Sequence, residues 1–224
     1  MDGCLGCLSL IYNDPAREYK KGRTEEQKKV IEYFRPSGGC IGIIASMFST
    51  MKDDVYESMI QNRVKKLNSM ENALNKLGID LEMVQEVKPI YLEGYYFENR
   101  RAFAKLGKDG KWRSSAYEFA WIFCGDKQIY VYRYRINMDE DGKNETAEEY
   151  FYKDVTNISH SNETVEKETY VGCLGLKKVK KNIDYTRFML SAMGDKFYCS
   201  ARASDEIERS VQGLKNKLRE KKNA

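Results

Sequence analysis

The spacing of apolar residues along the chain changes once, near Pro89. Before that point, apolar residues recur at intervals of three and four, which places them on one face of a helix. From Ile90 to Arg202 they alternate with polar residues in short runs, as in strands with one buried face. A last helical pattern covers Asp205 to Lys221. This order predicts an α+β protein, with a helical N-terminal region over residues 1–88 and a β domain with a C-terminal helix over residues 89–224.

Caps and glycines set the bounds of the predicted helices. Thr24 to Gln27 match a capping box at the start of the first helix. A single long helix is predicted over Asp53 to Leu77, because Asp residues suit a helix N-terminus and Gly78 follows as a C-terminal glycine. A shorter helix is predicted from Asp80 to Val87.

Turn residues separate the predicted strands. These strands are Ile90–Phe97, Ala102–Leu106, Trp112–Cys124, Gln128–Asn137, Tyr150–Lys153, Val155–Ser159, Glu163–Val171, Phe188–Ala192 and Phe197–Arg202. In the clearest of them, Tyr130, Tyr132, Tyr134 and Ile136 share one face. Gly172 to Lys181 is predicted to be a loop, since it is rich in glycine and lysine. An antiparallel meander followed by one helix favours a β-roll or barrel that the helix closes.

Four short segments carry a resemblance to a known protein family: Glu93–Phe97, Gly107–Arg113, Tyr150–Val155 and Gly194–Cys199. From about Leu74 to its end, the chain resembles an uncharacterised bacterial protein family. The C-terminal region also resembles pleckstrin-homology domains in its element order and its terminal helix. The resemblance implies a pleckstrin-homology-like fold, and it brings no known activity with it.

Composition and cysteine content favour a cytoplasmic protein. Charged residues make up 32% of the chain, and the formal net charge is +4, too small to imply a polyanionic partner by itself. The chain has six cysteines, at Cys4, Cys7, Cys40, Cys124, Cys173 and Cys199. Their sparse spacing is unlike that of a disulfide scaffold and predicts free thiols in a reducing compartment. The longest apolar run is too short for a transmembrane helix, so none is expected.

Metal and cofactor binding are not expected. Cys4 and Cys7 form a Cys-x-x-Cys pair, which a zinc knuckle or a redox site would also contain. A structural zinc site needs four ligands, and the sequence has neither a second such pair nor a pair of histidines. Ordinary thiols are therefore the favoured interpretation of this pair.

Few residues of the chain are suited to catalysis. His160 is the single histidine, and its neighbours Ser159 and Ser161 point to the opposite face of a strand. The sequence has no nucleophile elbow, Walker loop or dinucleotide-binding glycine motif. The chain is therefore predicted to be a non-enzymatic binding or scaffold module with a protein partner. An enzyme with an unrecognised carboxylate site is an alternative, although the pair Asp139 and Asp141 is typical of a solvated turn.

A basic cluster supports another alternative, the binding of an anionic ligand. Its residues are Lys177, Lys178, Lys180 and Lys181, all in the predicted loop. A lipid headgroup or a nucleic acid would bind such a cluster. A solvated loop explains the same residues, so a protein partner is favoured over lipid or nucleic acid.

Self-association through the long helix is also expected. Ile60, Val64, Leu67 and Leu74 lie on one stripe of this helix, and residues 39–51 are apolar and uncharged. A stripe of this kind is buried on a second copy of the chain or against helices of the same chain. The sequence leaves both arrangements open, and a homo-oligomer through the predicted helix at residues 53–77 is one of the two.

Overall fold

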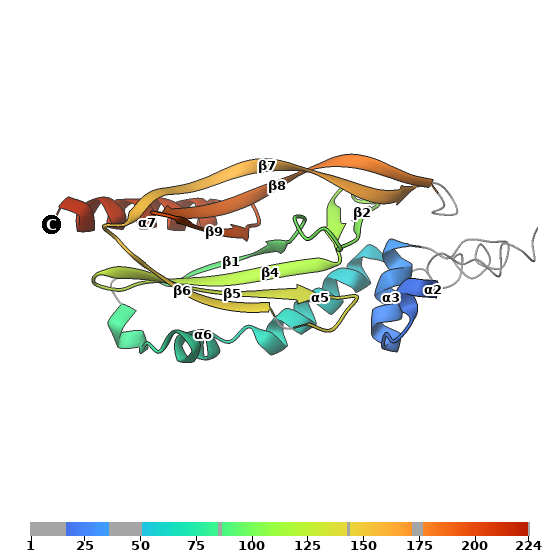
Figure 1. Cartoon of the computed structure of the whole chain (residues 1–224), viewed down its shortest axis with the longest axis horizontal. Helices are drawn as coiled ribbons and strands as arrows, with labels where there is room; N and C mark the ends of the chain where they lie inside the picture. Colours follow the sequence, from blue (N-terminus) through green and yellow to red (C-terminus); the bar gives the residue numbers. More distant parts are fainter. Residues whose placement is uncertain (1–16, 36–50, 85–86, 143, 172–176, 224) are drawn as a thin grey trace, which may run out of the picture.

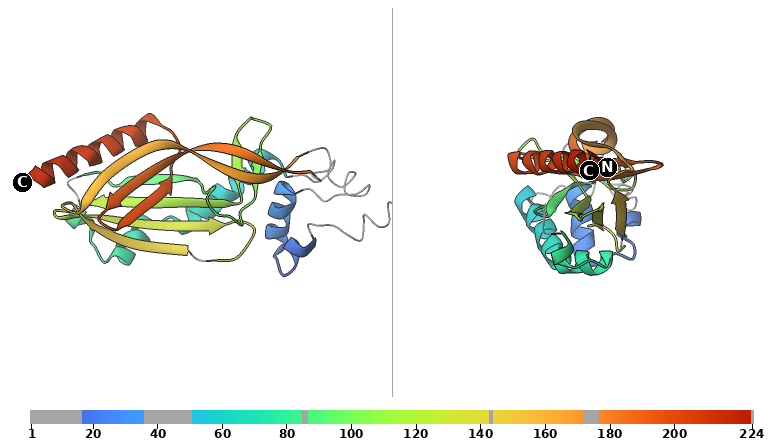
Figure 2. Two further views of the ribbon diagram at one scale, coloured as in Figure 1. Left: turned by 45° about the horizontal axis from the view of Figure 1, so that its top comes forward. Right: turned by 90° about the vertical axis from the view of Figure 1, so that its left-hand side faces the viewer.

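The chain forms three layers in the computed structural model, which describes residues 17–35, 51–84, 87–142, 144–171 and 177–223 (Figure 1). The middle layer, here called the first sheet, has four strands in the order β1-β4-β5-β6. Helices cover one of its faces. The second sheet, with five strands in the order β3-β2-β7-β8-β9, lies on the other face (Figure 2).

The elements have the following bounds. The strands are β1 (Ile90–Tyr95), β2 (Ala104–Leu106), β3 (Trp112–Ser114), β4 (Ala116–Cys124), β5 (Gln128–Asn137), β6 (Asn144–Phe151), β7 (Val155–Val171), β8 (Lys177–Ala192) and β9 (Asp195–Ser200). The helices are α2 (Arg17–Lys20), α3 (Glu25–Phe34), α5 (Asp53–Leu67), α6 (Met70–Leu77), the 3-10 helix η1 (Leu81–Val84) and α7 (Asp205–Asn223).

The predicted α+β class and C-terminal helix are confirmed, but the closed barrel is wrong. The meander divides after β6, because β7 pairs with β8 and β2 and not with a strand of the first sheet. Among the described strands, pairing is antiparallel except for one parallel pair, Ala104 with Thr169. The two sheets therefore pack against each other and do not close into one.

Alternation along β5 decides which side chains face each layer. Tyr130, Tyr132 and Ile136 lie in the core beneath the helices, as predicted. Ile129 and Val131 face the second sheet, where they share a core with residues of β8 and β9. The first sheet is thus apolar on both faces, as a middle layer requires.

Helices α5 and α6 replace the single helix that was predicted over residues 53–77. α5 ends at Leu67, and Ser69 begins α6 by accepting a hydrogen bond from the Asn72 backbone N–H at 3.2 Å. Serine readily leaves the helix to cap the next one, which the spacing of apolar residues does not reveal. Gly78 ends α6 with a φ of 66°, as predicted.

The other predicted helix ends are mostly correct. The Thr24 hydroxyl accepts from the Gln27 backbone N–H, and the Gln27 side chain accepts from Thr24 N–H, so the capping box is confirmed. The Ser204 hydroxyl accepts from the Ile207 backbone N–H at the start of α7. Of the helix predicted from Asp80 to Val87, the described part is a single 3-10 turn, η1, and residues 85–86 lie outside the described part of the chain.

Strands β7 and β8 form one long ribbon where the sequence predicts shorter pieces. Val155–Ser159 and Glu163–Val171 both belong to β7. The loop predicted to end at Lys181 is wrong from Lys177 onward, because Lys177 pairs with Val171 in the ladder. Most side chains in the first half of β8 are exposed, so that half lacks the alternation on which a strand prediction depends.

Helix α7 completes the core between the two sheets. Val211, Leu214 and Leu218 pack against apolar residues of both sheets, which confirms the stripe predicted for this helix. Among the helices of the described residues, none is long and apolar enough to cross a membrane.

Candidate functional site

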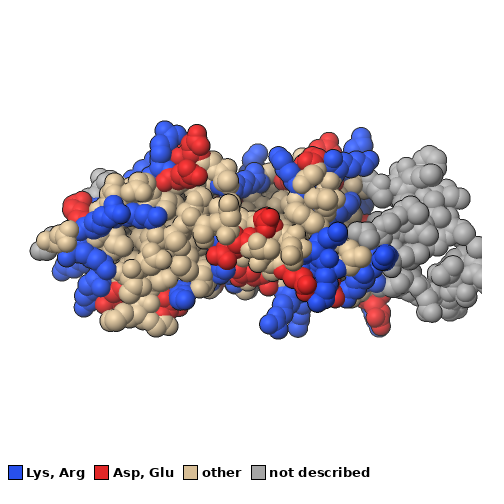
Figure 3. Space-filling model, turned by 90° about the horizontal axis from the view of Figure 1, so that it is seen from above, with Lys and Arg blue, Asp and Glu red and all other residues tan. Residues whose placement is uncertain are grey.

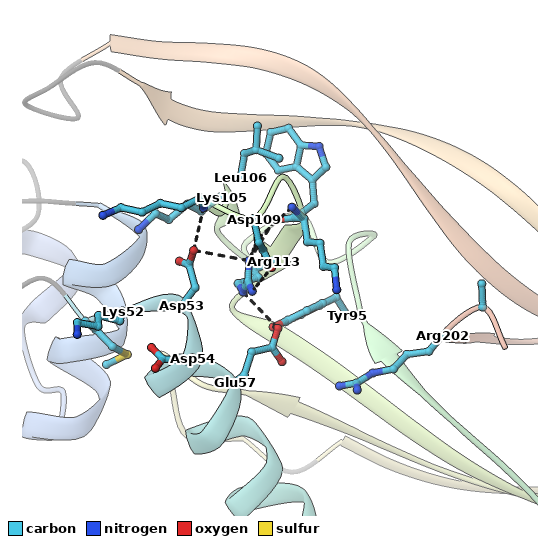
Figure 4. A pocket seen from close by; sticks show the side chains of 15 residues that line it. Lys52, Asp53, Asp54, Glu57, Tyr95, Lys105, Leu106, Asp109, Arg113 and Arg202 are labelled. Carbon is cyan, nitrogen blue, oxygen red and sulfur yellow. Dashed lines mark hydrogen bonds and ion pairs between the residues drawn. The ribbon is translucent and has the colours of Figure 1, made fainter.

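A cleft of about 1150 Å³ opens between α5, the β2–β3 hairpin and the segment after β9 (Figure 4). We call it the hairpin cleft. α5 contributes Asp53 and Glu57, β1 contributes Tyr95, and the segment after β9 contributes Arg202. Because these elements are far apart in sequence, the fold rather than a local motif assembles the cleft.

Arg113 lies at the centre of a charged cluster in this cleft, with only 4% of its side chain exposed. Its two terminal nitrogens donate to the two carboxylate oxygens of Asp109, each at 2.9 Å. Arg113 Nε lies 3.2 Å from Glu57 Oε1, and Arg113 Nη1 lies 4.0 Å from Asp53 Oδ2. A bidentate pair of this kind fixes the geometry of both partners. The guanidinium therefore joins the hairpin to α5.

Gly107 makes room for this cluster. A Cβ atom at Gly107 would lie 2.1 Å from Arg113 Nη1 and 2.8 Å from Asp53 Oδ2. Any larger residue would have to displace a side chain that is almost fully buried. The absence of a side chain at position 107 is thus a requirement of the site.

Asp53 also ties α3 to the hairpin. The Tyr33 hydroxyl donates to Asp53 Oδ1 at 2.8 Å, and the Lys108 backbone N–H donates to Asp53 Oδ2 at 2.8 Å. Lys105 Nζ donates to the Tyr33 carbonyl oxygen at 3.0 Å and lies 3.9 Å from the centre of the Tyr33 ring. The floor of the cleft is therefore rigid and internally hydrogen-bonded.

The electrostatics of the cleft keep Asp53 and Asp109 ionised. Hydrogen bonds from Arg113 hold the pKa of Asp109 well below its usual range. Burial alone would raise the pKa of Asp53, but hydrogen bonds from Tyr33 and the Lys108 amide lower it overall. Burial lowers the pKa of Lys105. Asp53 and Asp109 thus act as fixed negative charges at neutral pH.

The rim of the hairpin cleft has a different character. Lys52, Lys108 and Lys111 are exposed there, and no described carboxylate forms an ion pair with any of them. Leu106 is 49% exposed beside the half-buried Trp112. The rim therefore offers free positive charge next to an apolar surface.

A second cleft of about 760 Å³ lies between the turn after β1, α2 and the distal part of β7. We call it the turn cleft. Asp139 lines it, and burial raises the pKa of this carboxyl above its usual value. The Ser115 hydroxyl donates to Asp139 and opposes this shift.

The four lysines predicted to bind an anion lie on a strand, not in a loop, and all four are described within β8. Lys178 Nζ lies 2.6 Å from Glu168, and Lys180 Nζ lies 2.7 Å from Glu166. Lys177 and Lys181 stay exposed. Cross-strand carboxylates thus neutralise half of the predicted cluster, because β7 supplies two glutamates beside it.

The four residues predicted to mediate self-association pack within their own chain. Ile60 and Val64 are buried beneath the first sheet, and Leu67 and Leu74 pack partly buried against the same core. The stripe covers the chain's own β4 and β5 rather than neighbouring helices alone. Self-association stays a prediction, but this stripe is largely occupied. Residues 39–50 lie outside the described part of the chain.

The structure describes two of the six cysteines. Cys124 and Cys199 are buried, and burial raises the pKa of Cys199. Cys4, Cys7, Cys40 and Cys173 lie outside the described residues. No group of His, Cys, Asp or Glu in the described residues has the arrangement of a metal site.

His160 lies on β7 in a half-buried position. Its Nε2 atom is buried and has no hydrogen-bond partner among the described residues. Burial lowers its pKa, so the neutral form is favoured. The neighbouring serines lie on the opposite face of the strand, which excludes a local nucleophile–base pair.

The sequence did not single out Arg113, Asp109 or Glu57 as site residues. The glycines at 107 and 110 indicated a tight turn near Arg113. The partner carboxylates on α5 come from a distant part of the chain, and no local pattern indicated them. Comparison of the chain with family models, with curated proteins and with solved structures found no match. The site must therefore be interpreted from its own geometry.

Proposed function

We propose that the chain is a non-enzymatic binding module that holds a segment of a protein partner in the hairpin cleft. The observation that carries this proposal is the contrast between floor and rim. The floor is a rigid network around Arg113, whereas the rim carries free lysines beside the exposed Leu106. A segment with an apolar side chain and flanking acidic residues complements that rim.

The state of the carboxylates supports binding rather than proton transfer. A general acid or base works best with a pKa near the operating pH. Asp53 and Asp109 instead have a lowered pKa, because they accept hydrogen bonds from Tyr33, Lys108 and Arg113. Such groups suit recognition by fixed charge.

The distribution of surface charge favours a protein over a polyanion. On the face drawn in Figure 3, Lys and Arg alternate with Asp and Glu and do not form one large patch. A nucleic acid or an anionic membrane attracts a continuous basic surface. The ligands of pleckstrin-homology domains differ widely. The analogy with these domains is therefore compatible with a protein ligand but does not identify a particular ligand.

Leu106→Asp is expected to abolish binding of the partner segment. The test selects peptides from a random library on the wild-type protein and measures their affinity by fluorescence anisotropy. We expect acidic peptides with one large apolar residue, and a loss of affinity of at least about tenfold in the variant, since aspartate repels the acidic flank.

Leu81→Asp is the matched control, because Leu81 is 43% exposed and does not line the hairpin cleft. It should leave the affinity unchanged. Selected peptides that tolerate Leu106→Asp would contradict the proposed site. Salt-sensitive binding to anionic vesicles or single-stranded RNA, without any selected peptide, would replace the protein partner with lipid or nucleic acid.

Asp139 is the observation that favours an enzyme as a second candidate. A buried carboxyl with a raised pKa in a cleft is typical of a catalytic acid, and such residues reduce stability. Because the folded-state pKa is raised, stability is full at low pH and is lost as the pH rises through that pKa. Asp139→Asn should therefore raise the free energy of unfolding at pH 7 by on the order of 1 kcal/mol.

Urea denaturation of both proteins at pH 4 and pH 7 checks this prediction. The advantage of Asp139→Asn should shrink at pH 4, where the wild-type carboxyl is more protonated. The control is Asp141→Asn, since Asp141 is exposed and accepts a hydrogen bond from Gln27. A loss of stability at pH 7 on replacing Asp139 would remove the support for a carboxylate enzyme.

A further inference from the structure

The turn cleft contains more positive charge than its own carboxylates neutralise. Arg100, Arg101 and Lys167 line it, and none of them forms an ion pair with a carboxylate of the described residues. Arg100 and Arg101 are exposed on the turn between β1 and β2. This surface is separate from the hairpin cleft, so the inference does not depend on the function proposed there.

The carboxylates around the turn cleft are already engaged with other cations. The ion pairs are Glu98 with Arg187 at 2.6 Å, Glu140 with Arg23 at 3.2 Å, Glu166 with Lys180 at 2.7 Å, and Glu168 with Lys178 at 2.6 Å. Asp139 is the remaining acidic residue of the lining, and burial favours its neutral form. No lining carboxylate is therefore free to compensate the arginines and Lys167.

Lys167 is the buried member of this group, with only 7% of the residue exposed. Its Nζ donates to the Asn99 carbonyl oxygen at 2.5 Å, and the same oxygen accepts from the Ala102 backbone N–H at 3.1 Å. This contact holds the turn that carries the two arginines. An ammonium group has three donors, and a buried charge without a counter-ion is costly. Burial accordingly lowers the pKa of Lys167.

Arg35 adds a further cation beside the cleft. Its guanidinium carbon lies 4.7 Å from the ring centre of Tyr19 and 4.6 Å from that of Tyr170, and both tyrosines line the cleft. Arg35 Nη1 is buried and has no hydrogen-bond partner among the described residues. Two aromatic rings that line the cleft thus fix a guanidinium with an unused donor.

We propose that the turn cleft binds a small ligand through a phosphate group, which Arg100, Arg101 and Lys167 contact. Phosphate is favoured over a single carboxylate, because it carries up to two charges and three acceptor oxygens that suit several cations at once. The ligand would supply the counter-ion that Lys167 lacks. A purely structural role for Lys167, holding the turn, accounts for its one hydrogen bond but not for the unpaired arginines.

Isothermal titration calorimetry tests this site. Pyrophosphate is titrated into the full chain at constant ionic strength. We expect saturable binding with one site per chain. The double variant Arg100→Gln with Arg101→Gln should weaken it by at least about tenfold. Both arginines are exposed, so this variant should keep the unfolding midpoint of the wild type.

A matched control removes the same charge elsewhere. Lys177→Gln with Lys181→Gln changes two exposed lysines of β8 that do not line the cleft, and should alter the affinity less than about twofold. Lys167→Met keeps the apolar stem and removes the charge, and it should weaken binding as the arginine variant does. Absence of saturable binding, or equal losses in the arginine variant and the lysine control, would overturn the proposal.

A parallel arm distinguishes the source of the phosphate. Sedimentation with vesicles that contain a phosphoinositide, in competition with free pyrophosphate, compares a lipid headgroup with a soluble ligand. Displacement from vesicles by pyrophosphate indicates one shared phosphate site. Vesicle binding that pyrophosphate does not displace, and that the arginine variant retains, would assign the lipid to another surface and count against this site.

Discussion

Replacing Glu118 with alanine is expected to lower the free energy of unfolding by about 3–5 kcal/mol, because it removes a buried carboxylate that pairs with Arg135 within the first sheet and joins this sheet to the second through Ser200. Glu118 lies on β4 and is 2% exposed. Its Oε2 accepts from Arg135 Nε at 3.0 Å, and its Oε1 accepts from the backbone N–H and the hydroxyl of Ser200, at 2.6 and 2.8 Å. Removal of the carboxylate leaves Arg135 and the end of β9 without these acceptors.

The neighbouring glycine shows why this contact forms. Gly94 pairs with Glu118 across the β1–β4 ladder, and a Cβ at Gly94 would lie 3.1 Å from Ser200 Cβ. The absent side chain lets β9 approach the first sheet closely enough for Ser200 to reach the carboxylate. The pair of Gly94 and Glu118 thus sets the distance between the sheets at this point.

Urea denaturation at pH 7 measures the effect of Glu118→Ala. Glu149→Ala is the control, since Glu149 is exposed on β6 and accepts a hydrogen bond only from the half-buried Gln128 side chain among the contacts described. It should change stability by less than about 0.5 kcal/mol. A loss below about 1 kcal/mol for Glu118→Ala would show that the packing of the sheets does not depend on this carboxylate.

Features that depend on neighbouring residues were predictable from the sequence. The capping box at Thr24, the glycine that ends α6 at Gly78 and the two faces of β5 follow from local chemistry and from alternation. They are confirmed because each needs only a few adjacent positions. The helical stripe of α7 belongs to the same group.

Features that depend on distant pairing were not predictable in this way. The division of the meander after β6 depends on β7 pairing with β8, and the first half of β8 is mostly exposed and lysine-rich. The ladder partner of Lys177 is Val171, on the other side of a segment that the sequence presents as a loop. In that segment the strand forms because it pairs with β7, and its hydrophobic periodicity does not predict it.

The candidate site was the least predictable part. In the sequence, Asp109 is typical of an ordinary turn residue, and Glu57 is typical of a residue on the polar face of a helix. They become one cluster only when the hairpin packs against α5 and both meet Arg113. The unpaired cations of the turn cleft have the same origin, since Lys167 on β7 meets the turn at Asn99 through the fold.

The cluster around Arg113 has an electrostatic role, which the pH dependence of the free energy of unfolding will reveal. The pKa values of Asp53 and Asp109 are lowered, so their contribution to stability is present above the unfolded-state pKa and is lost as the pH falls through the folded-state pKa. In a variant without the guanidinium, Asp109 loses its main hydrogen-bond donor and the nearby carboxylates repel one another. The difference between the two proteins should therefore be largest at neutral pH.

Arg113→Met is expected to lower the free energy of unfolding at pH 7 by about 2 kcal/mol, less than a fully buried pair would cost. The expected loss is smaller because the partners are partly exposed. The Asp109 and Glu57 side chains are 41% and 33% exposed, so water can solvate their carboxylates in the variant. Denaturation from pH 7 to pH 3 should show the difference shrink below about pH 4, because Asp109 becomes protonated in the unfolded chain while Arg113 keeps it ionised in the folded wild type. Arg113→Lys keeps the charge and loses the bidentate fork. Its free energy of unfolding should therefore lie between those of the wild type and of Arg113→Met. A loss that is the same at pH 3 and pH 7 would assign Arg113 to packing alone.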